Sequence, residues 1–265
     1  MAHVNEPWHI VQLTDSHLFE DEQQRLQGMD TQASFHAVAD AVRAERPRVD
    51  LILGTGDITQ DRSAAAYRLF YDAAMALAPD MVWIPGNHDE AEVMKSLSFA
   101  TDCNRRIIDN EHWRIIMLDS SVPGKVHGEL SAGELVFLEE ALVSAGNRHV
   151  LVSLHHNPIP SECAWLDQHK LRNSQAFHDV LAPCEQLKVV LWGHIHQHVE
   201  KVIDGVHYLA TPSTCVQFAP QQTEFKLDDK PPGYRWLDLY PDGHVETDIS
   251  RVDVELYVDL GGNGY

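Results

Sequence analysis

The sequence predicts an α/β fold, in which short buried strands alternate with amphipathic helices. Six short apolar runs, rich in leucine and β-branched residues, are bounded by turn residues, which is typical of strands buried on both faces. Helical patterns lie between these runs, and the chain has no fixed-period repeat and no low-complexity linker. We therefore expect one domain over residues 1–250, a sandwich of mixed sheets covered by helices, followed by a C-terminal tail over residues 251–265. The six runs are 9–15, 49–57, 81–89, 114–120, 149–156 and 189–196.

Two helices can be placed from residue patterns. Apolar residues from Phe35 to Val42 recur with the spacing i, i+3, i+4, i+7, and the pattern stops before Pro47, so a helix is expected there. Ser131 and Glu134, three positions apart, predict a capping box that opens a second helix. After residue 205 the pattern becomes rich in β-forming residues, which predicts further strands toward the end of the chain.

The charge balance and the apolar pattern argue against several classes of protein. The 265 residues contain 20 Lys and Arg against 40 Asp and Glu, a formal net charge of −20, so we expect no nucleic-acid partner. No apolar run approaches the length of a membrane span, and the first residues lack a basic stretch followed by an apolar one, so we expect neither a membrane partner nor a secretory signal. Four separated cysteines without a C-x-x-C motif favour reduced thiols and a cytoplasmic protein.

Histidine is frequent in this chain, and its placement is informative. There are 17 histidines, and histidine is the commonest metal ligand in proteins. Acids, histidines and an asparagine follow five of the six predicted strands. Because the loops beyond the carboxyl ends of strands gather at one edge of an open α/β sheet, we expect these side chains to meet there. They are Asp15 and His17, Asp57, Asn87 and His88, His155 and His156, and His194 and His196.

Each of these motifs, taken alone, has an ordinary structural explanation. With 17 histidines, chance placement gives about one H-x-H match, so His194 and His196 by themselves indicate little. The motifs Asp15-x-His17, G-D and L-H-H-N-P could each be a strand-end turn or a buried histidine. The G-N-H-D motif at 86–89 differs, because chance gives about 0.03 matches to G-N-H. All five motifs in order, each at a strand end, favour a functional site.

In this order, the motifs D-x-H, G-D, G-N-H-D, H-x-x-P and G-H-x-H resemble the calcineurin-like metallophosphoesterase superfamily. Segments 127–131, 163–173 and 210–218 are similar, more specifically, to bacterial class III 3′,5′-cyclic AMP phosphodiesterases. The resemblance covers roughly residues 8 to 250. It implies a four-layer α/β/β/α sandwich and hydrolysis of 3′,5′-cyclic AMP to 5′-AMP by a water that a pair of metals activates.

The resemblance also implies a role for each site residue. Asp57 bridges two divalent metals, and His88 stabilises the transition state or donates a proton to the leaving oxygen. His155 rather than His156 is the implied ligand, because H-H-N-P aligns with the family's H-H-P-P on the first histidine. Mixed imidazole and carboxylate ligands suit Fe²⁺ or Mn²⁺, with Zn²⁺ or Co²⁺ as alternatives. Asp57 is shared by the two implied metal sites. The other ligands are Asp15, His17 and His196 at one site and Asn87, His155 and His194 at the other. The implied substrate contacts are His17, Asn87, His88 and His196.

Several residues have two interpretations at this point. Asp89 and Asp119 could each orient a metal-bound histidine or stabilise a turn. Residues 163–173 could form a lid over a nucleobase or a plain surface loop. The side chains of that segment that could contact a nucleobase are Trp165, Asp167, His169 and Asn173.

Other functions also remain open. The same metals could serve another small phosphodiesterase, acting on glycerophosphodiesters or 2′,3′-cyclic nucleotides, and a non-catalytic metal-bound scaffold is a third alternative. The acidic composition disfavours a nuclease. The C-terminal tail could form a homodimer contact or cover the site.

Overall fold

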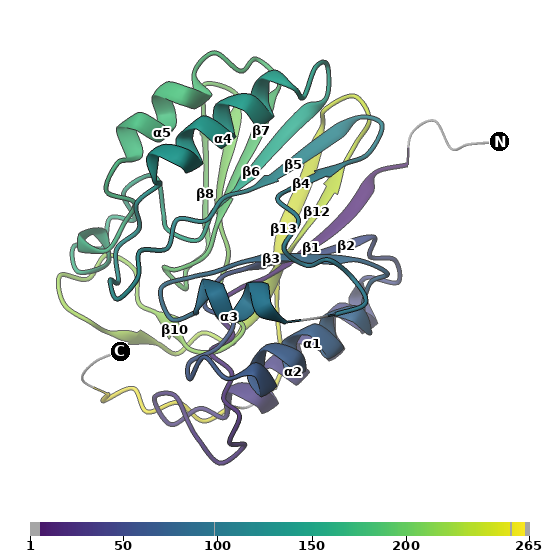
Figure 1. Ribbon diagram of the computed structural model, residues 1–265. Helices are drawn as coiled ribbons and strands as arrows, with labels where there is room; N and C mark the ends of the chain where they lie inside the picture. Colours follow the sequence, from purple (N-terminus) through teal and green to yellow (C-terminus); the bar gives the residue numbers. More distant parts are fainter. Residues whose placement is uncertain (1–5, 98, 255, 263–265) are drawn as a thin grey trace.

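The computed structural model describes residues 6–97, 99–254 and 256–262. Two β-sheets pack against each other at the centre, and helices cover both outer sides (Figure 1). This architecture confirms the expected α/β sandwich of two mixed sheets flanked by helices.

The first sheet has five strands: β1 Trp8–Leu13, β2 Leu51–Thr55, β3 Met81–Ile84, β12 Gly233–Leu239 and β13 Val245–Arg251. Their order is β13-β12-β1-β2-β3. The pairs β1–β2 and β2–β3 are parallel, and β12 pairs antiparallel with both β1 and β13. Parallel neighbours need crossover connections, which here contain helices. The helices of this half are α1 Thr31–Glu45, α2 Ala64–Met75 and α3 Ala91–Ser96.

The second sheet has six strands: β4 Ile107–Asp109, β5 Trp113–Met117, β6 His149–Ser153, β7 Leu187–Trp192, β8 Val199–Ile203 and β9 Val206–Ala210. Their order is β4-β5-β6-β7-β9-β8, with β5, β6, β7 and β9 parallel. Two longer helices belong to this half, α4 Ala132–Val143 and α5 Ser174–Leu181, together with the short 3₁₀ helix η1 Leu166–Gln168. A separate hairpin contains β10 Gln217–Phe218 and β11 Leu227–Asp228.

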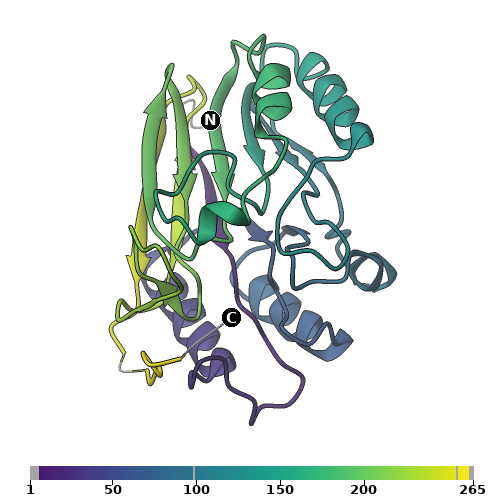
Figure 2. The same cartoon turned by 90° about the vertical axis from the view of Figure 1, so that its left-hand side faces the viewer.

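Three apolar cores hold the four layers together. The core between the sheets joins Ile10 and Leu53 of the first sheet to Leu191 and Leu209 of the second. A second core packs α1 and α2 on the first sheet, and a third packs α4 and α5 on the second. Figures 1 and 2 show these helix pairs on opposite sides of the molecule.

The helix starts follow the expected patterns only in part. The helix predicted around Phe35 is α1, which ends at Glu45, before Pro47. Ser131 caps α4, because its hydroxyl accepts a hydrogen bond from the Glu134 backbone amide at 3.1 Å. The other half of the predicted capping box, a hydrogen bond from the Ser131 backbone amide to the Glu134 side chain, is wrong. The Glu134 carboxylate binds Arg106 and the backbone amide of Asp119 instead of returning to Ser131.

The end of the described chain folds back onto the segment that follows β1. The backbone amide of Asp259 donates a hydrogen bond to Gln27 O at 2.8 Å, and the two segments lie side by side in Figure 2. Val258 packs against the core around α4 and α5. The division of the chain at residue 250 stays a prediction. Among the described residues, no helix is long and apolar enough to cross a membrane.

Candidate metal centre

Five loops meet at one edge of the sandwich, each following a strand with a parallel neighbour. The loops after β1, β2 and β3 come from the first sheet, and those after β6 and β7 come from the second. Side chains of the two sheets contact each other here. His155 Nε2 lies 3.2 Å from Asp57 Oδ2, and His196 Nε2 lies 3.2 Å from Asp15 Oδ1. The structure therefore brings residues from distant motifs into one cluster.

The backbone at this edge is held in the left-handed region. The φ angles are 55° at Asp15, 46° at His17, 48° at Asp57, 65° at His194 and 48° at His196. Such angles are uncommon for residues other than glycine. Each costs on the order of 1–3 kcal/mol and persists where the surrounding structure holds it, which is most often at functional sites.

Two glycines allow the loops to approach each other closely. A Cβ on Gly86 would lie 2.2 Å from Asp57 Oδ1, and a Cβ on Gly193 would lie 2.5 Å from Asp15 Oδ2. No side chain fits at such distances. The glycines of G-N-H-D and G-H-I-H are therefore needed to place the carboxylates beside the third and last loops.

Four of the predicted ligands form a buried first subsite. His17 Nε2 lies 3.3 Å from His196 Nε2 and 3.8 Å from Asp57 Oδ2, and Asp15 completes the group through His196. All four side chains are buried. Imidazole nitrogens bind a metal at about 2.0–2.1 Å, so two nitrogens at this separation can share one ion.

The second subsite contains buried polar atoms that lack a partner. In the described part of the chain, Asn87 Oδ1 and His194 Nε2 make no hydrogen bond, and His155 Nε2 faces the Asp57 carboxylate at 3.2 Å. An unsatisfied buried polar atom costs about 1–3 kcal/mol, so two together call for an explanation. The imidazole rings of His155 and His194 are 5.1 Å apart, and residues on both sides of Asn87 contact Asp57. Two imidazole nitrogens and an amide oxygen are suitable donors for a divalent metal, so these residues fit the implied ion.

The outer nitrogens of three histidines are fixed by hydrogen bonds. His17 Nδ1 pairs with Gln60 Oε1 at 2.7 Å, His155 Nδ1 with Thr55 O at 2.8 Å and His196 Nδ1 with Val216 O at 2.7 Å. A backbone carbonyl only accepts, so Nδ1 carries the proton in the last two pairs. Their Nε2 atoms therefore face the centre, as metal-binding histidines do.

Burial and opposite charges shift the titration of this cluster. Burial raises the pKa of Asp57, but His155 and His88 outweigh it and hold that pKa well below its usual range. Burial lowers the pKa of His155, but the Asp57 carboxylate outweighs this effect and raises it to about 9. Burial alone dominates at His17, where it lowers the pKa to about 3, and at His194, where the pKa also falls well below its usual value.

His88 lies at the side of the first subsite and is half-buried. Its ring is edge-on to that of His17, with centroids 4.9 Å apart, and its backbone amide donates to Asp57 Oδ1 at 2.8 Å. The His88 carbonyl accepts from Arg62 Nε at 3.1 Å. The imidazole thus stands beside the cluster on a backbone that Asp57 fixes in place.

His156 takes a different role from His155. Its Nδ1 pairs with Ser120 Oγ at 2.8 Å and its Nε2 with Val126 O at 3.1 Å, so both ring nitrogens are engaged. The ring also packs against Gly128, where a Cβ would lie 2.4 Å from His156 Cγ. His156 therefore holds the loop before α4 and leaves His155 to face the centre.

Within the residues that the structure describes, the hydrogen bonds of the Asp89 and Asp119 side chains go to backbone amides and hydroxyls, and none of them goes to a metal-site histidine. Asp89 accepts hydrogen bonds from the amides of Ile58, Thr59 and Gly86, at 3.1, 3.1 and 2.9 Å. It therefore joins the loop after β2 to the loop after β3. Asp119 stabilises a turn, since its Oδ1 accepts from the amide and hydroxyl of Ser121.

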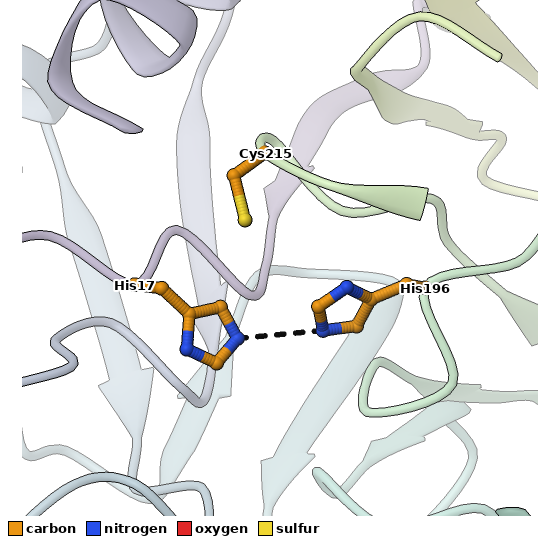
Figure 3. A group of neighbouring side chains, drawn as sticks. All are labelled: His17, His196 and Cys215. Carbon is orange, nitrogen blue, oxygen red and sulfur yellow. Dashed lines mark hydrogen bonds between the residues drawn. The ribbon is translucent and has the colours of Figure 1, made fainter. Parts of the chain in front are cut away.

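A buried cysteine beside the cluster was not singled out by the sequence. Figure 3 shows the Cys215 sulfur turned toward the imidazoles of His17 and His196, and the three potential ligand atoms lie within 4.8 Å of one another. Burial raises the pKa of Cys215 to about 12, and its sulfur accepts a hydrogen bond from Ser213 Oγ at 3.3 Å. The H-x-H pattern gave no signal for it, because Cys215 comes from a different segment.

Polar side chains of the predicted lid segment, residues 163–173, form hydrogen bonds with neighbouring parts of the protein. Asn173 Oδ1 accepts from the Leu130 amide and its Nδ2 donates to Leu130 O, while Asp167 accepts from Ser161. Trp165 packs edge-on against Phe218. Asn173 and Asp167 therefore hold neighbouring loops, and a lid over a nucleobase stays a prediction.

The fold and this cluster define a metal-dependent phosphoesterase architecture, and comparison with known proteins agrees. The family model "Calcineurin-like phosphoesterase" matches residues 9–198. The chain belongs to this family, which implies a dinuclear site for divalent metals.

Two curated relatives match nearly the whole chain. A protein of Pseudomonas aeruginosa named 3′,5′-cyclic adenosine monophosphate phosphodiesterase CpdA is 49% identical, covering 97% of this chain and 94% of its own length. The protein of the same name from Escherichia coli K12 is 43% identical with the same coverage. Among solved structures, a dimetal phosphatase from Danio rerio aligns with a TM-score of 0.65 at 16% identity, covering 94% of this chain and all of that one. The last likeness supports the fold.

Proposed function

We propose that this chain hydrolyses 3′,5′-cyclic AMP to 5′-AMP in a metal-dependent reaction and thereby lowers cyclic AMP. The observation that carries the proposal is the position of Asp57 Oδ2, which lies 3.2 Å from His155 Nε2 and 3.8 Å from His17 Nε2. One carboxylate oxygen thus faces histidines of both subsites, as a bridging ligand would. The names of the two curated relatives support cyclic AMP as the substrate.

The proposed ligand sets follow the sequence motifs. Asp57 is shared, and the first ion takes Asp15, His17 and His196 while the second takes Asn87, His155 and His194. Imidazoles with carboxylates suit Fe²⁺ or Mn²⁺, and Zn²⁺ or Co²⁺ are alternatives. When bound, such a pair supplies charge neutralisation and an activated water for attack on phosphorus.

The chain's own residues provide the rest of the chemistry. His88, half-buried beside His17, is placed to hydrogen-bond a phosphoryl oxygen and to protonate the leaving 3′ oxygen. Asp57 fixes the backbone of His88 through the 2.8 Å hydrogen bond, so the acid keeps its position relative to the bridging carboxylate. His17, Asn87 and His196 are the further proposed substrate contacts.

Local charge explains how an acidic protein can bind an anionic substrate. The net charge is −20, but at a Debye length of about 8 Å distant charges are screened. Two divalent ions with Asp15 and Asp57 leave the centre at about +2, so the local field attracts the phosphodiester.

The decisive experiment is metal removal followed by a substrate panel. Chelation should abolish hydrolysis of cyclic AMP, and Mn²⁺ or Fe²⁺ should restore it. Comparing kcat/KM for cyclic AMP, cyclic GMP, 2′,3′-cyclic nucleotides and glycerophosphodiesters should rank cyclic AMP first. Turnover that persists in metal-free protein, or a higher kcat/KM for a glycerophosphodiester, would contradict the proposal.

Asp57→Asn provides the matched variant for this experiment. The amide preserves the acceptor for the His88 backbone but removes the charge shared by both subsites, so metal content and kcat should both fall. Asp119→Asn, at a turn stabilised within residues 119–121, is the control and should retain both.

The remaining assignments belong to the same proposal. The acidic composition supports an enzyme without nucleic-acid partners, and we propose that it acts in the cytoplasm without a membrane partner. A homodimer is proposed for the face that carries the C-terminal tail. Light scattering and cell fractionation test these assignments directly.

A further inference from the structure

A chain of buried polar side chains crosses the apolar layer between the two sheets. Gln12 on β1 and Arg235 on β12 are direct cross-strand partners, and Thr211 directly follows β9 in the second sheet. All three are fully buried, with 0% of each exposed. Along the same two strands the preceding pair on this face is Ile10 with Leu237, which belongs to the apolar core between the sheets.

The Gln12 amide connects the strand ends that precede the metal-site loops. Its Nε2 donates to Thr55 Oγ1 at 2.7 Å, at the end of β2, and to Trp192 O at 3.2 Å, at the end of β7. Thr55 is two residues before Asp57, and Trp192 is two residues before His194. A single side chain therefore ties the first sheet to the second immediately behind both subsites.

Arg235 fixes the orientation of that amide through Thr211. The Arg235 Nε donates to Thr211 Oγ1 at 3.2 Å, so the Thr211 hydroxyl turns its proton to Gln12 Oε1. Gln12 must then direct its NH₂ group toward Thr55 and Trp192. The guanidinium is held in turn by Glu200 at 2.7 Å and by Thr247 at 3.0 Å.

Stability alone does not account for this arrangement. Burying a charged guanidinium is costly, and apolar side chains of similar volume in its place are often neutral or stabilising. The arrangement instead sets a distance between the sheets, because the proposed metal ligands come from both. Asp15, His17, Asp57 and Asn87 follow strands of the first sheet, and His155, His194 and His196 follow strands of the second.

We propose that Gln12 is a positioning residue for the metal pair. Its side-chain amide fixes the separation of the two strand ends that carry Asp57 and His194, and Thr211 and Arg235 keep this amide oriented. This inference rests on the proposed dinuclear function. It predicts that losing the link changes the spacing of the two ions more than it changes the stability of the fold.

The test compares two Thr→Val substitutions that both remove a hydroxyl partner of Arg235. Thr211→Val breaks the link to Gln12, whereas Thr247→Val leaves that link intact. Each protein is loaded with Mn²⁺, and the exchange coupling between the two ions is followed by electron paramagnetic resonance over temperature. Thr211→Val should change the coupling and lower kcat about tenfold with little change in KM, since small displacements at a reaction centre are costly. Thr247→Val should match the wild type in both.

Gln12→Met supplies an independent variant of similar volume. It should shift the coupling in the same direction as Thr211→Val while the thermal midpoint changes little. Should Gln12→Met fail to fold, Thr211→Val still decides the question. Wild-type coupling and kcat in Thr211→Val, or equal effects in Thr247→Val, would overturn the positioning role while leaving the proposed function intact. A wild-type protein without a coupled Mn²⁺ pair would overturn both.

Discussion

The carboxylate of Asp15, at the end of β1, accepts a hydrogen bond from the backbone amide of His194, 179 residues later in the chain. The amide nitrogen lies 3.1 Å from each carboxylate oxygen. Asp15 follows β1 of the first sheet and His194 follows β7 of the second sheet. A proposed metal ligand therefore also links the two halves of the sandwich. Folding and assembly of the metal centre are therefore coupled.

Replacing His88 by alanine should impair the reaction without emptying the metal site. His88 is half-buried and is not among the proposed ligands, so metal content and thermal midpoint should stay close to those of the wild type. Loss of a general acid should lower kcat by about 10²–10⁴. Steady-state kinetics with elemental analysis of the same sample measures both. Near-normal kcat, or loss of metal together with activity, would contradict the role of His88 as a general acid.

Metal affinity should rise with pH. In the metal-free protein the pKa of His155 is raised to about 9, so at pH 7 its Nε2 carries a proton that a metal must displace. Because the folded metal-free state holds this proton until pH approaches 9, affinity for the second ion should rise up to about tenfold per pH unit below that value. Calorimetry in buffers of different ionisation enthalpy should detect release of about one proton. Affinity that stays constant between pH 7 and 8.5 contradicts the prediction.

Asp89→Asn should destabilise the loops after β2 and β3. The asparagine amide would face at least one of the three backbone amides that now donate to the carboxylate, and a donor facing a donor leaves a buried group unpaired. The cost should be about 1–3 kcal/mol in the free energy of unfolding, measured in urea. Activity should fall as well, because His88 and Asp57 lie on these loops. Asp119→Asn again serves as the control, and equal stability of the two variants would show that the Asp89 hydrogen bonds contribute little.

Gly128→Ala should destabilise the loop that His156 holds. Its Cβ would lie 2.4 Å from His156 Cγ, a contact that requires the ring or the loop to move, and overpacking of this kind costs about 1–3 kcal/mol. Gly133→Ala is the matched control, because its Cβ would meet only Ser131 Oγ at 3.6 Å and alanine favours the helix by up to about 1 kcal/mol. Thermal unfolding of the pair should move the midpoint in opposite directions. A shift in the same direction for both would refute this account of the loop.

Residue types and their order along the chain determined the fold class, the family and the candidate ligands. Apolar runs ending in Asp, Asn or His are local features, and the loops after parallel strands lie at one edge of a sheet, so Asp15, Asp57 and Asn87 could be expected to converge. The start of α4 at Ser131 was readable for the same reason, since an N-cap depends on residues three positions apart.

The tertiary structure decided what depends on contacts between distant segments. The engagement of both His156 nitrogens by Ser120 and Val126, which leaves His155 to face the centre, is invisible in the H-H-N-P motif. The hydrogen bonds from Gln12 to Thr55 and Trp192 likewise join strands 43 and 180 residues away in sequence. A hydrogen-bond partner is chosen by position in space, and only the packing of one sheet on the other brings these groups within reach.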